Sequence, residues 1–227
     1  MKNWGLLLGL IFFCYSCENK AQDKSNQLPK ANKANNQKVN TFSLNEAQDR
    51  YATAYFAGGC FWCVEAIYED VIGVEAAISG YAGGHTANPT YQQTNTGKTG
   101  HAEAVKIIYD PNFIDFSTLL DIYFKTLNWS QENGQGPDFG SQYRSIAFYN
   151  NPQEKKLIEN YISRLKQTTN QPVAVEVKAF DKFWVAEDYH QDYEANNPNN
   201  PYIQNVSKKR YEMFKRQFPD LVKPTNE

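Results

Sequence analysis

Long apolar runs, an excess of positive charge and cysteine are all scarce in this chain. The apolar stretch from Leu6 to Phe13 is eight residues long and contains Gly9, whereas a membrane-spanning helix needs about 20 apolar residues. The formal net charge is −2, so no basic surplus is available to bind nucleic-acid phosphates. Neither low-complexity sequence nor an internal repeat occurs after residue 42. These absences argue against a helical span in that stretch and against a nucleic-acid partner.

The first residues read MKNWGLLLGLIFFCYSC. Lys2 followed by a short apolar run is typical of a secretory signal, and Ser16 directly before Cys17 resembles a bacterial lipoprotein signal. The alternatives are an ordinary signal peptide or an uncleaved anchor. We predict a lipoprotein-type signal over residues 1–16 and lipid attachment at Cys17. The protein is then exported and lipid-anchored in the bacterial cell envelope, at a periplasmic or outer-membrane face.

Residues 17–41 hold few apolar side chains and are rich in Asn, Lys and Gln. Such a segment buries too little apolar surface to offset its ordering entropy, so we predict a flexible tether. Residues 42–218 are predicted to form one domain, and 219–227 a short tail. This length is sufficient for a single core, and the aromatic content of 15% supports a globular domain.

The predicted mature domain keeps two cysteines, Cys60 and Cys63, out of four in the chain. A disulfide between positions three apart closes a very small loop and constrains the unfolded chain little. This spacing suits a pair that alternates between dithiol and disulfide. A structural zinc site needs four ligands, and the three histidines form no second paired cluster. We therefore predict no metal and no cofactor.

Periodicity and turn residues predict the order of elements. We expect strands at 51–57, 74–81, 102–109, 144–149 and 173–180. We expect helices at 60–69, 117–127 and 152–166, with short helical pieces at 188–195 and 206–217. The order βαββαβ indicates an α+β domain with a ferredoxin-like α/β sandwich core, its helices packed on one face of a largely antiparallel sheet. The two long loops, 83–100 and 128–142, are candidates for functional segments.

The stretch AGGCFWCVE, residues 57–65, is the strongest candidate for chemistry. A thiol at the start of a helix faces the positive end of the helix dipole, which predicts a lowered pKa for Cys60. Gly58 and Gly59 lack side chains and would let a ligand approach closely. The alternative is a pair of buried structural thiols. Phe61 and Trp62 could form a pocket for a methyl or thioether group, or could belong to the core.

Several motifs in order resemble the A-type peptide methionine sulfoxide reductases. They are AGGCFWCVE (57–65), GYAGGHTANPTY (80–91), GHAEAV (100–105), GPDFGSQYRS (136–145), AEDYHQDY (186–193) and Asn197-Pro198. The resemblance covers about residues 50–200. It implies a repair reductase that converts methionine S-sulfoxide, free or within a protein, to methionine. The fold that it implies agrees with the βαββαβ order.

The resemblance also implies roles for the matching positions. The catalytic cysteine is Cys60, the methyl pocket is Phe61 and Trp62, the carboxyl beside the sulfoxide oxygen is Glu103, the hydroxyl donors are Tyr91 and Tyr143, and the nearby acidic residue is Asp138. Chemistry supports this set, because sulfoxide reduction needs a soft nucleophile and a proton donor at oxygen. A buried glutamate keeps its proton, and phenol hydroxyls stabilise developing oxygen charge.

Each of these residues also has a simpler interpretation. Glu103 alternates with two alanines and could be an exposed charge on a strand. The two tyrosines belong to a set of fifteen, and Asp138 could be a turn residue. His101 and His190 are interpreted as structural hydrogen-bonding residues, and Arg144 as a residue that pairs or packs at the rim of the cleft.

The regeneration step is the least determined part of the prediction. Many members of the resembling family carry a resolving thiol in the C-terminal tail, whereas this chain ends in FPDLVKPTNE. Cys63 is the remaining candidate, although two cysteines three apart on a regular helix are poorly placed for a disulfide. If the first turn cannot loosen, Cys63 is structural and an external thiol reduces the sulfenic acid.

The expected partners are oxidised methionine-containing proteins and a thioredoxin-like reductant, with membrane contact only through the lipid. We expect a monomer. Two other functions stay open at this point. One is a thioredoxin-like protein-disulfide oxidoreductase that uses Cys60-x-x-Cys63, and the other is a lipid-anchored protein that binds methionine-rich surfaces without turnover.

Overall fold

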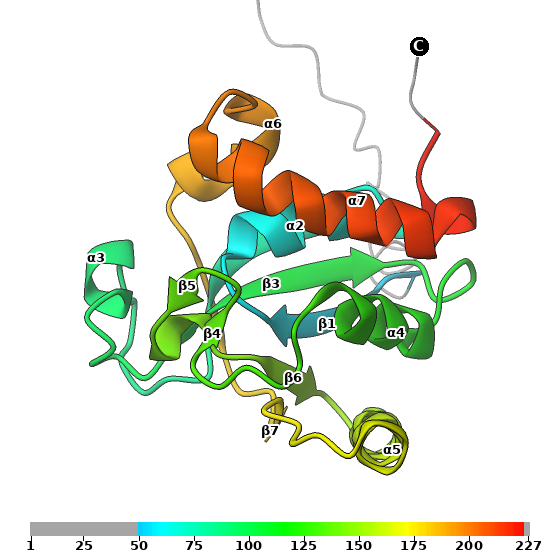
Figure 1. Cartoon of the computed structure of the whole chain (residues 1–227). Helices are drawn as coiled ribbons and strands as arrows, with labels where there is room; N and C mark the ends of the chain where they lie inside the picture. The colour runs from blue at the N-terminus through cyan, green and yellow to red at the C-terminus, as the bar shows by residue number, and fades with distance from the viewer. Residues whose placement is uncertain (1–49, 225–227) are drawn as a thin grey trace, which may run out of the picture. The chain divides into compact units, whose positions relative to one another are not determined.

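The structure is a computed structural model, and it describes residues 50–224 (Figure 1). The signal predicted over 1–16, lipid attachment at Cys17, the tether over 17–41 and the start of the domain at 42 lie outside the described residues. Within residues 50–224, no helix combines the length and the apolar character that crossing a bilayer requires.

A six-stranded sheet forms the centre of the domain (Figure 1). Its strands are β1 (Ala52–Ala57), β2 (Val74–Ala82), β3 (Ala102–Tyr109), β6 (Ile146–Tyr149), β7 (Glu176–Ala179) and β8 (Phe183–Val185). The order is β7-β6-β1-β3-β2-β8, and only the β6–β7 pair is parallel. The inner four strands, in the order β6-β1-β3-β2, have the predicted ferredoxin-like arrangement, in which strand β3 separates β1 from β2.

Four longer helices accompany this sheet: α2 (Phe61–Glu69), α4 (Phe116–Thr126), α5 (Pro152–Thr169) and α7 (Lys208–Gln217). Figure 1 shows α2 and α7 side by side above the strands, with α4 on the same side and α5 beside β6 and β7. The shorter helical segments are α3 (Tyr91–Thr94), η1 (Ser141–Tyr143), η2 (Asp188–His190), α6 (Tyr193–Asn196), η3 (Ile203–Ser207) and η4 (Pro219–Leu221). Helices thus cover mainly one face of the sheet, as the sequence predicts.

Alternation along β1 explains how both faces of the sheet are filled. Phe56 points toward the helices, where its ring lies 4.7 Å from the ring of Tyr123 between centroids. Tyr55 points to the opposite face and stacks on Phe180 at 3.6 Å. Because this second face is covered by side chains from the β7–β8 segment, the central strands are buried on both sides.

Local sequence signals account for the helix ends. Asp115 caps α4 by accepting a hydrogen bond from the Thr118 amide at 2.8 Å. Asn151 caps α5 in the same way, and Pro152 occupies its first turn. Helix α5 continues to Thr169, three residues beyond its predicted end, and stops at Asn170 with φ +54°, a left-handed conformation that is common at helix ends.

The segment after α5 differs from the prediction. The strand expected over 173–180 is shortened to β7, and β8 was not predicted. Strand β8 packs against Gly80, where a Cβ would lie 2.3 Å from both the Phe183 ring and the Trp184 carbonyl. Three residues of strand carry little periodic signal, so this pairing depends on the space that glycine leaves. The loop 128–142 contains a small hairpin, β4 (Gly134–Gln135) and β5 (Asp138–Phe139).

Candidate active site

Cys60 lies between β1 and α2, directly before the first helical residue. Its backbone is extended, with φ −55° and ψ 124°, so the helix begins at Phe61 rather than at Cys60. The preceding turn requires Gly59, whose φ is +81° and whose Cβ would lie 2.5 Å from the Gln135 side chain. The Gly59 amide donates to the Tyr143 carbonyl at 3.1 Å. The position of the thiol therefore depends on a turn that favours glycine strongly.

The space beside the two glycines is occupied by the protein itself. A Cβ at Gly58 would lie 3.3 Å from the Tyr123 ring and 3.5 Å from Nη2 of Arg210. The Tyr123 hydroxyl donates to the Ala57 carbonyl at 2.7 Å, within the buried core. The space that the missing side chains of the two glycines leave is filled by Tyr123, Arg210 and Gln135. Close approach of a ligand at this turn stays a prediction.

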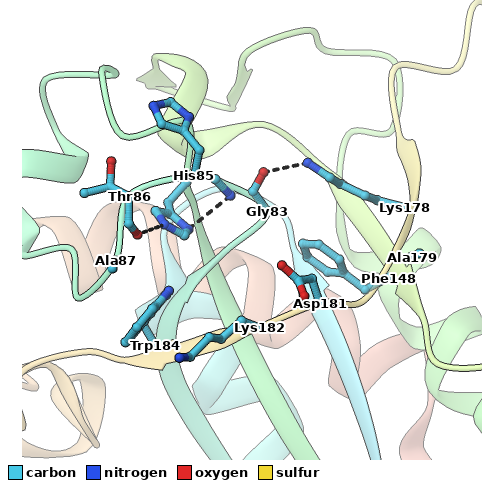
Figure 2. Close-up of a pocket in the computed structure, with 12 residues that line it drawn as sticks. Gly83, His85, Thr86, Ala87, Phe148, Lys178, Ala179, Asp181, Lys182 and Trp184 are labelled. Carbon is cyan, nitrogen blue, oxygen red and sulfur yellow. Dashed lines mark hydrogen bonds between the residues drawn. The ribbon is translucent and has the colours of Figure 1, made fainter.

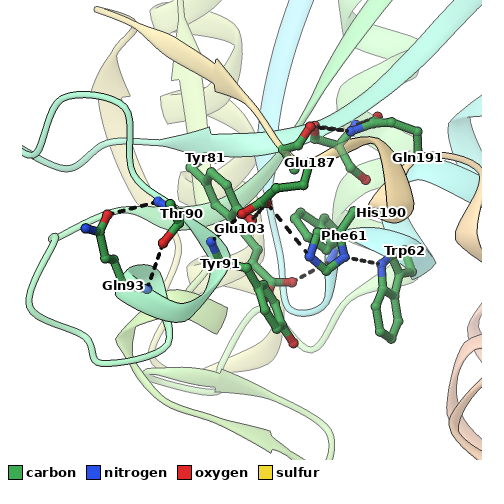
Figure 3. Close-up of polar contacts among 12 residues, drawn as sticks. Phe61, Trp62, Tyr81, Thr90, Tyr91, Gln93, Glu103, Glu187, His190 and Gln191 are labelled. Atoms are coloured by element: carbon green, nitrogen blue, oxygen red, sulfur yellow. Dashed lines mark hydrogen bonds and ion pairs between the residues drawn. The ribbon is translucent and has the colours of Figure 1, made fainter. Parts of the chain in front are cut away.

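Glu103 extends from the middle of the sheet toward the start of α2. Its Oε2 accepts a hydrogen bond from the Phe61 amide at 3.0 Å (Figure 3), and the residue is 2% exposed. Burial raises the pKa of Glu103 to about 8, more than the Phe61 amide lowers it. The interpretation as an exposed strand charge is wrong. At neutral pH this carboxyl holds a proton next to the helix start that carries Cys60.

The predicted low pKa of Cys60 is not what the structure shows. Burial is the largest effect and raises the pKa of Cys60 well above its usual value, and the charges of Cys63 and Glu103 act in the same direction. The Trp62 amide at the helix start does lower it, as the helix field predicts, but it is outweighed. The thiol is 7% exposed, so desolvation dominates here.

Cys63 behaves in the opposite way. A hydrogen bond from Cys60 lowers the pKa of Cys63 to about 7, against burial, which raises it. The positive charge of Arg210 and hydrogen bonds from Ser207 and Tyr202 lower it further. The reduced pair thus loses its first proton near neutral pH, with the negative charge favoured on Cys63.

Phe61 and Trp62 differ in their surroundings. Phe61 is 1% exposed and belongs to the core. Trp62 is partly exposed and stacks on Tyr193 with ring centroids 3.7 Å apart. The Trp62 indole N–H donates to Nδ1 of His190 at 3.1 Å (Figure 3), and the His190 ring lies 4.9 Å from that of Phe61. The stack on Tyr193 and the hydrogen bond to His190 therefore hold the Trp62 ring in place, and His190 has the structural role that the sequence indicates.

The two candidate phenols come from the two long loops. Tyr91 begins helix α3, its amide donates to Glu187 at 2.9 Å, and its ring lies 4.4 Å from that of His190. Tyr143 ends η1 and is joined to the Cys60 turn through Gly59. Burial raises the pKa of both Tyr91 and Tyr143, so both hydroxyls remain hydrogen-bond donors at neutral pH.

Asp138 lies in the β4–β5 hairpin and is tied to a residue that the sequence reasoning missed. The Tyr202 hydroxyl donates to Asp138 at 2.6 Å and lies 3.8 Å from the Cys63 sulfur. Burial raises the pKa of Asp138. Tyr202 thus connects the acidic candidate with Cys63. A tyrosine after Asn-Pro-Asn-Asn-Pro carries no motif signal of its own.

The loop over 83–100 is anchored at both ends. The Gly100 carbonyl accepts from Arg144 at 2.9 Å, and Arg144 also pairs with Glu176 at 2.9 Å, which agrees with its predicted rim position. The Gly83 carbonyl accepts from Lys178 at 2.6 Å (Figure 2). The pocket of about 210 Å³ drawn there contains none of the predicted site residues.

A second set of contacts holds the loop from inside. Glu187 accepts from the Tyr91 amide with one carboxylate oxygen and from the Tyr81 hydroxyl with the other, at 2.9 and 2.8 Å (Figure 3). His101 uses both ring nitrogens, toward the Gly84 amide and the Thr86 carbonyl, as its structural interpretation requires. The sequence reasoning missed Glu187, although the motif AEDYHQDY contains it.

A cavity of about 310 Å³ reaches both thiols. Besides Cys60 and Cys63, its wall includes Asp138, Tyr202 and Arg210. Across residues 50–224, no group of three or more histidine, cysteine, aspartate or glutamate side chains is placed to hold a metal ion. Glu103, Tyr91 and Tyr143 do not line this cavity, but each interacts electrostatically with Cys60. The thiol pair, the protonated carboxyl and the phenol donors form a set suited to reducing a polar sulfur–oxygen bond.

The chain matches the peptide methionine sulfoxide reductase family over residues 52–221. The proteins named peptide methionine sulfoxide reductase MsrA from Haloquadratum walsbyi and Pasteurella multocida are 42% and 44% identical to it over 170 residues. These matches cover 75% of this chain and 98% of each relative.

Solved structures agree with these matches. Mxr1 from Saccharomyces cerevisiae in reduced form has a TM-score of 0.62 at 27% identity, covering 67% of this chain and 88% of that one. Methionine sulfoxide reductase A of Corynebacterium diphtheriae has a TM-score of 0.60 at 33% identity, covering 66% and 76%. The chain therefore belongs to the peptide methionine sulfoxide reductase family.

Proposed function

We propose that this protein is a peptide-methionine (S)-S-oxide reductase, which converts methionine S-sulfoxide, peptide-bound or free, to methionine. The observation that carries the proposal is a buried carboxyl, Glu103, with a pKa of about 8, hydrogen-bonded to the amide that follows Cys60. A thioredoxin-like disulfide oxidoreductase has no need for such an acid, and the family match does not favour that alternative.

In the first step the Cys60 sulfur attacks the sulfoxide sulfur. The proton shared by the thiol pair moves to Cys63, and Glu103 gives its proton to the sulfoxide oxygen. Tyr91 and Tyr143 donate hydrogen bonds to that oxygen while charge develops on it, and Trp62 packs against the substrate methyl group. The oxygen passes to Cys60, which becomes a sulfenic acid as methionine leaves. The methionine sulfur gains two electrons and the Cys60 sulfur loses two.

In the second step Cys63 attacks the Cys60 sulfenic acid. The Cys63 thiol loses its proton, a sulfur–sulfur bond forms, and the oxygen takes a proton and departs as water. Cys60 precedes the first residue of α2, so a Cys60–Cys63 disulfide does not have to fit within a regular helical turn. This supports Cys63 as the resolving thiol.

A dithiol protein of thioredoxin type then restores the reduced pair. Its thiolate attacks one sulfur of the disulfide, and its second thiol releases the resulting mixed disulfide, with two electrons passing to the enzyme. We further propose that the enzyme acts as a monomer, exported and lipid-anchored through Cys17, so that oxidised envelope proteins are its substrates. Export, lipid attachment and the choice of substrates rest on the sequence pattern of residues 1–41.

The test is a steady-state assay with separate methionine S- and R-sulfoxide and dithiothreitol as reductant. We expect methionine from the S epimer and none from the R epimer, and no product from Cys60→Ser. Reduction of insulin disulfides at a comparable rate, together with no methionine formation, would instead identify a disulfide oxidoreductase. A Cys63→Ser variant tests the second step, because it should accumulate a sulfenic acid that dimedone traps.

A further inference from the structure

Arg210 reaches from helix α7 to the turn before Cys60. Its Nε donates to the Thr126 carbonyl and its Nη1 to the Gly58 carbonyl, each at 2.6 Å. Among the ion pairs of residues 50–224, none involves Arg210. Two backbone carbonyls fix the guanidinium, and in the described part of the chain no carboxylate lies within ion-pair distance of it.

The fixed charge lies on the wall of the cavity that both thiols share. The groups that influence Cys63 directly are Cys60 before α2, Glu103 from β3, Tyr202, Ser207 from η3 and Arg210 from α7. Asp138 from β5 lines the same cavity, accepts a hydrogen bond from the Tyr202 hydroxyl and interacts with the charge of Arg210. Glu103, once ionised, opposes a thiolate there. Tyr202 and Ser207 contribute hydrogen bonds only. Arg210 is the one cation among these groups.

We propose that Arg210 is a positioning residue for regeneration, which holds the thiolate of Cys63 poised against the Cys60 sulfenic acid. The step in which it acts is the one given above: the Cys63 thiolate forms the sulfur–sulfur bond, the Cys60 sulfur–oxygen bond breaks, and the oxygen leaves as water after taking a proton. The inference rests on the proposed function for this step, whereas its electrostatic part concerns the reduced protein alone.

The lowered pKa of Cys63 agrees with this geometry, because the charge of Arg210 is one of its causes. An opposite charge within about 4–6 Å typically lowers a pKa by 1–3 units. The hydroxyls of Tyr202 and Ser207 would remain if the charge were removed. The contribution of Arg210 can therefore be separated from theirs by substitution.

The first test needs no substrate. In a Cys60→Ser background, the rate of Cys63 alkylation by iodoacetamide is followed from pH 5 to 10. We expect Arg210→Gln to move the midpoint up by about one pH unit, which slows alkylation about tenfold at low pH. Arg210→Lys should stay near the parent, and Lys209→Gln, which removes the neighbouring cation of the same cavity, should not shift it. Equal midpoints for Arg210→Gln and Lys209→Gln would overturn the proposal.

The second test follows disulfide formation after one turnover without reductant. Arg210→Gln should form the Cys60–Cys63 disulfide about tenfold more slowly at pH 7 and recover by pH 9, where Cys63 ionises unaided. A loss that is equal at all pH values would indicate a merely structural role and overturn the proposal. If Arg210→Gln does not fold, Arg210→Lys is used in the alkylation assay instead. A midpoint of Cys63 alkylation near that of the Cys60→Ser parent supports the proposed effect of the positive charge, and a midpoint one full pH unit higher refutes it. If the unaltered enzyme releases no methionine, the proposed function fails while the alkylation result still stands.

Discussion

The substitution Glu103→Gln removes the acidic proton of this side chain and keeps its size and shape. The amide oxygen of glutamine can still accept from the Phe61 amide, which Glu103 does at 3.0 Å, so the helix start should keep its position. The variant has no proton to give to the sulfoxide oxygen. General-acid catalysis contributes about 10²- to 10⁴-fold, so methionine release should slow by that factor, equivalent to about 3–5 kcal/mol.

The pH profile makes this prediction more specific. With a pKa of about 8, roughly nine-tenths of Glu103 is protonated at pH 7. Methionine release should therefore fall about tenfold per pH unit above 8 in the unaltered enzyme. This descending limb should be absent from Glu103→Gln, whose remaining activity depends on the thiol pair alone.

The substitution Glu103→Gln should lower the rate of methionine release but raise the free energy of unfolding. Glu103 has a folded-state pKa raised from 4.5 to about 8, so its stabilising effect is complete below pH 4.5 and is lost as pH rises through 8. The whole shift corresponds to about 5 kcal/mol, of which about 3 kcal/mol is lost by pH 7. Since glutamine does not ionise, Glu103→Gln should be more stable than the unaltered protein at pH 7 by a free energy of unfolding of that order.

The two measurements are single-turnover methionine release and urea unfolding, each from pH 5 to 9. Glu75→Gln is the matched control, because Glu75 is an exposed strand glutamate and should change neither curve appreciably. The reasoning is refuted if Glu103→Gln releases methionine within twofold of the normal rate, or if it is less stable than the unaltered protein at pH 7.

Three further predictions concern the site's supports. Gly59→Ala should lower the free energy of unfolding by more than about 2 kcal/mol, because φ is +81° and a Cβ would lie 2.5 Å from a neighbouring side chain. Gly136→Ala, with φ +57° and no atom within 4 Å, should cost only the backbone strain of about 1 kcal/mol, and equal losses would contradict this. Burial raises the pKa of Glu65 to about 7, so the unaltered protein should lose about 3 kcal/mol of its free energy of unfolding between pH 4.5 and 7. Urea unfolding of Glu65→Gln should not show this loss. His190→Leu leaves the Trp62 indole N–H unpaired and should raise KM several-fold, whereas His190→Asn, which can accept from that N–H, should have a KM near the normal value. An unchanged KM in both variants would refute the role of His190 in positioning Trp62.

The central motif could be predicted from sequence because its signals are local. Alternation in 51–57 and the glycine pair before Cys60 placed a strand, a turn and a helix start in the correct order, and alternation in 102–109 placed the strand that carries Glu103. The burial of Glu103 could not be read from alternation, since β3 is a central strand covered on both faces. When both sides of a strand are buried, a residue between two alanines gives no sign of its exposure.

The electrostatics of the thiol pair depended on tertiary packing. The helix start predicts a lowered pKa at Cys60, and the Trp62 amide does act that way, but burial reverses the net direction. Arg210 and Tyr202 come from a C-terminal segment without a recognisable motif. Their approach to Cys63 joins positions more than 130 residues apart, and single-sequence patterns carry no information about such pairs.

The most direct test of the account is the stoichiometry of one turnover. The reduced protein is mixed with excess methionine S-sulfoxide or R-sulfoxide without any reductant, and methionine, free thiols and the disulfide-linked peptide are measured together. The account predicts one methionine per chain from the S epimer only, the loss of two thiols, and a Cys60–Cys63 linkage in the peptide map. Methionine release from a Cys60→Ser variant, or equal release from the R epimer, would contradict it.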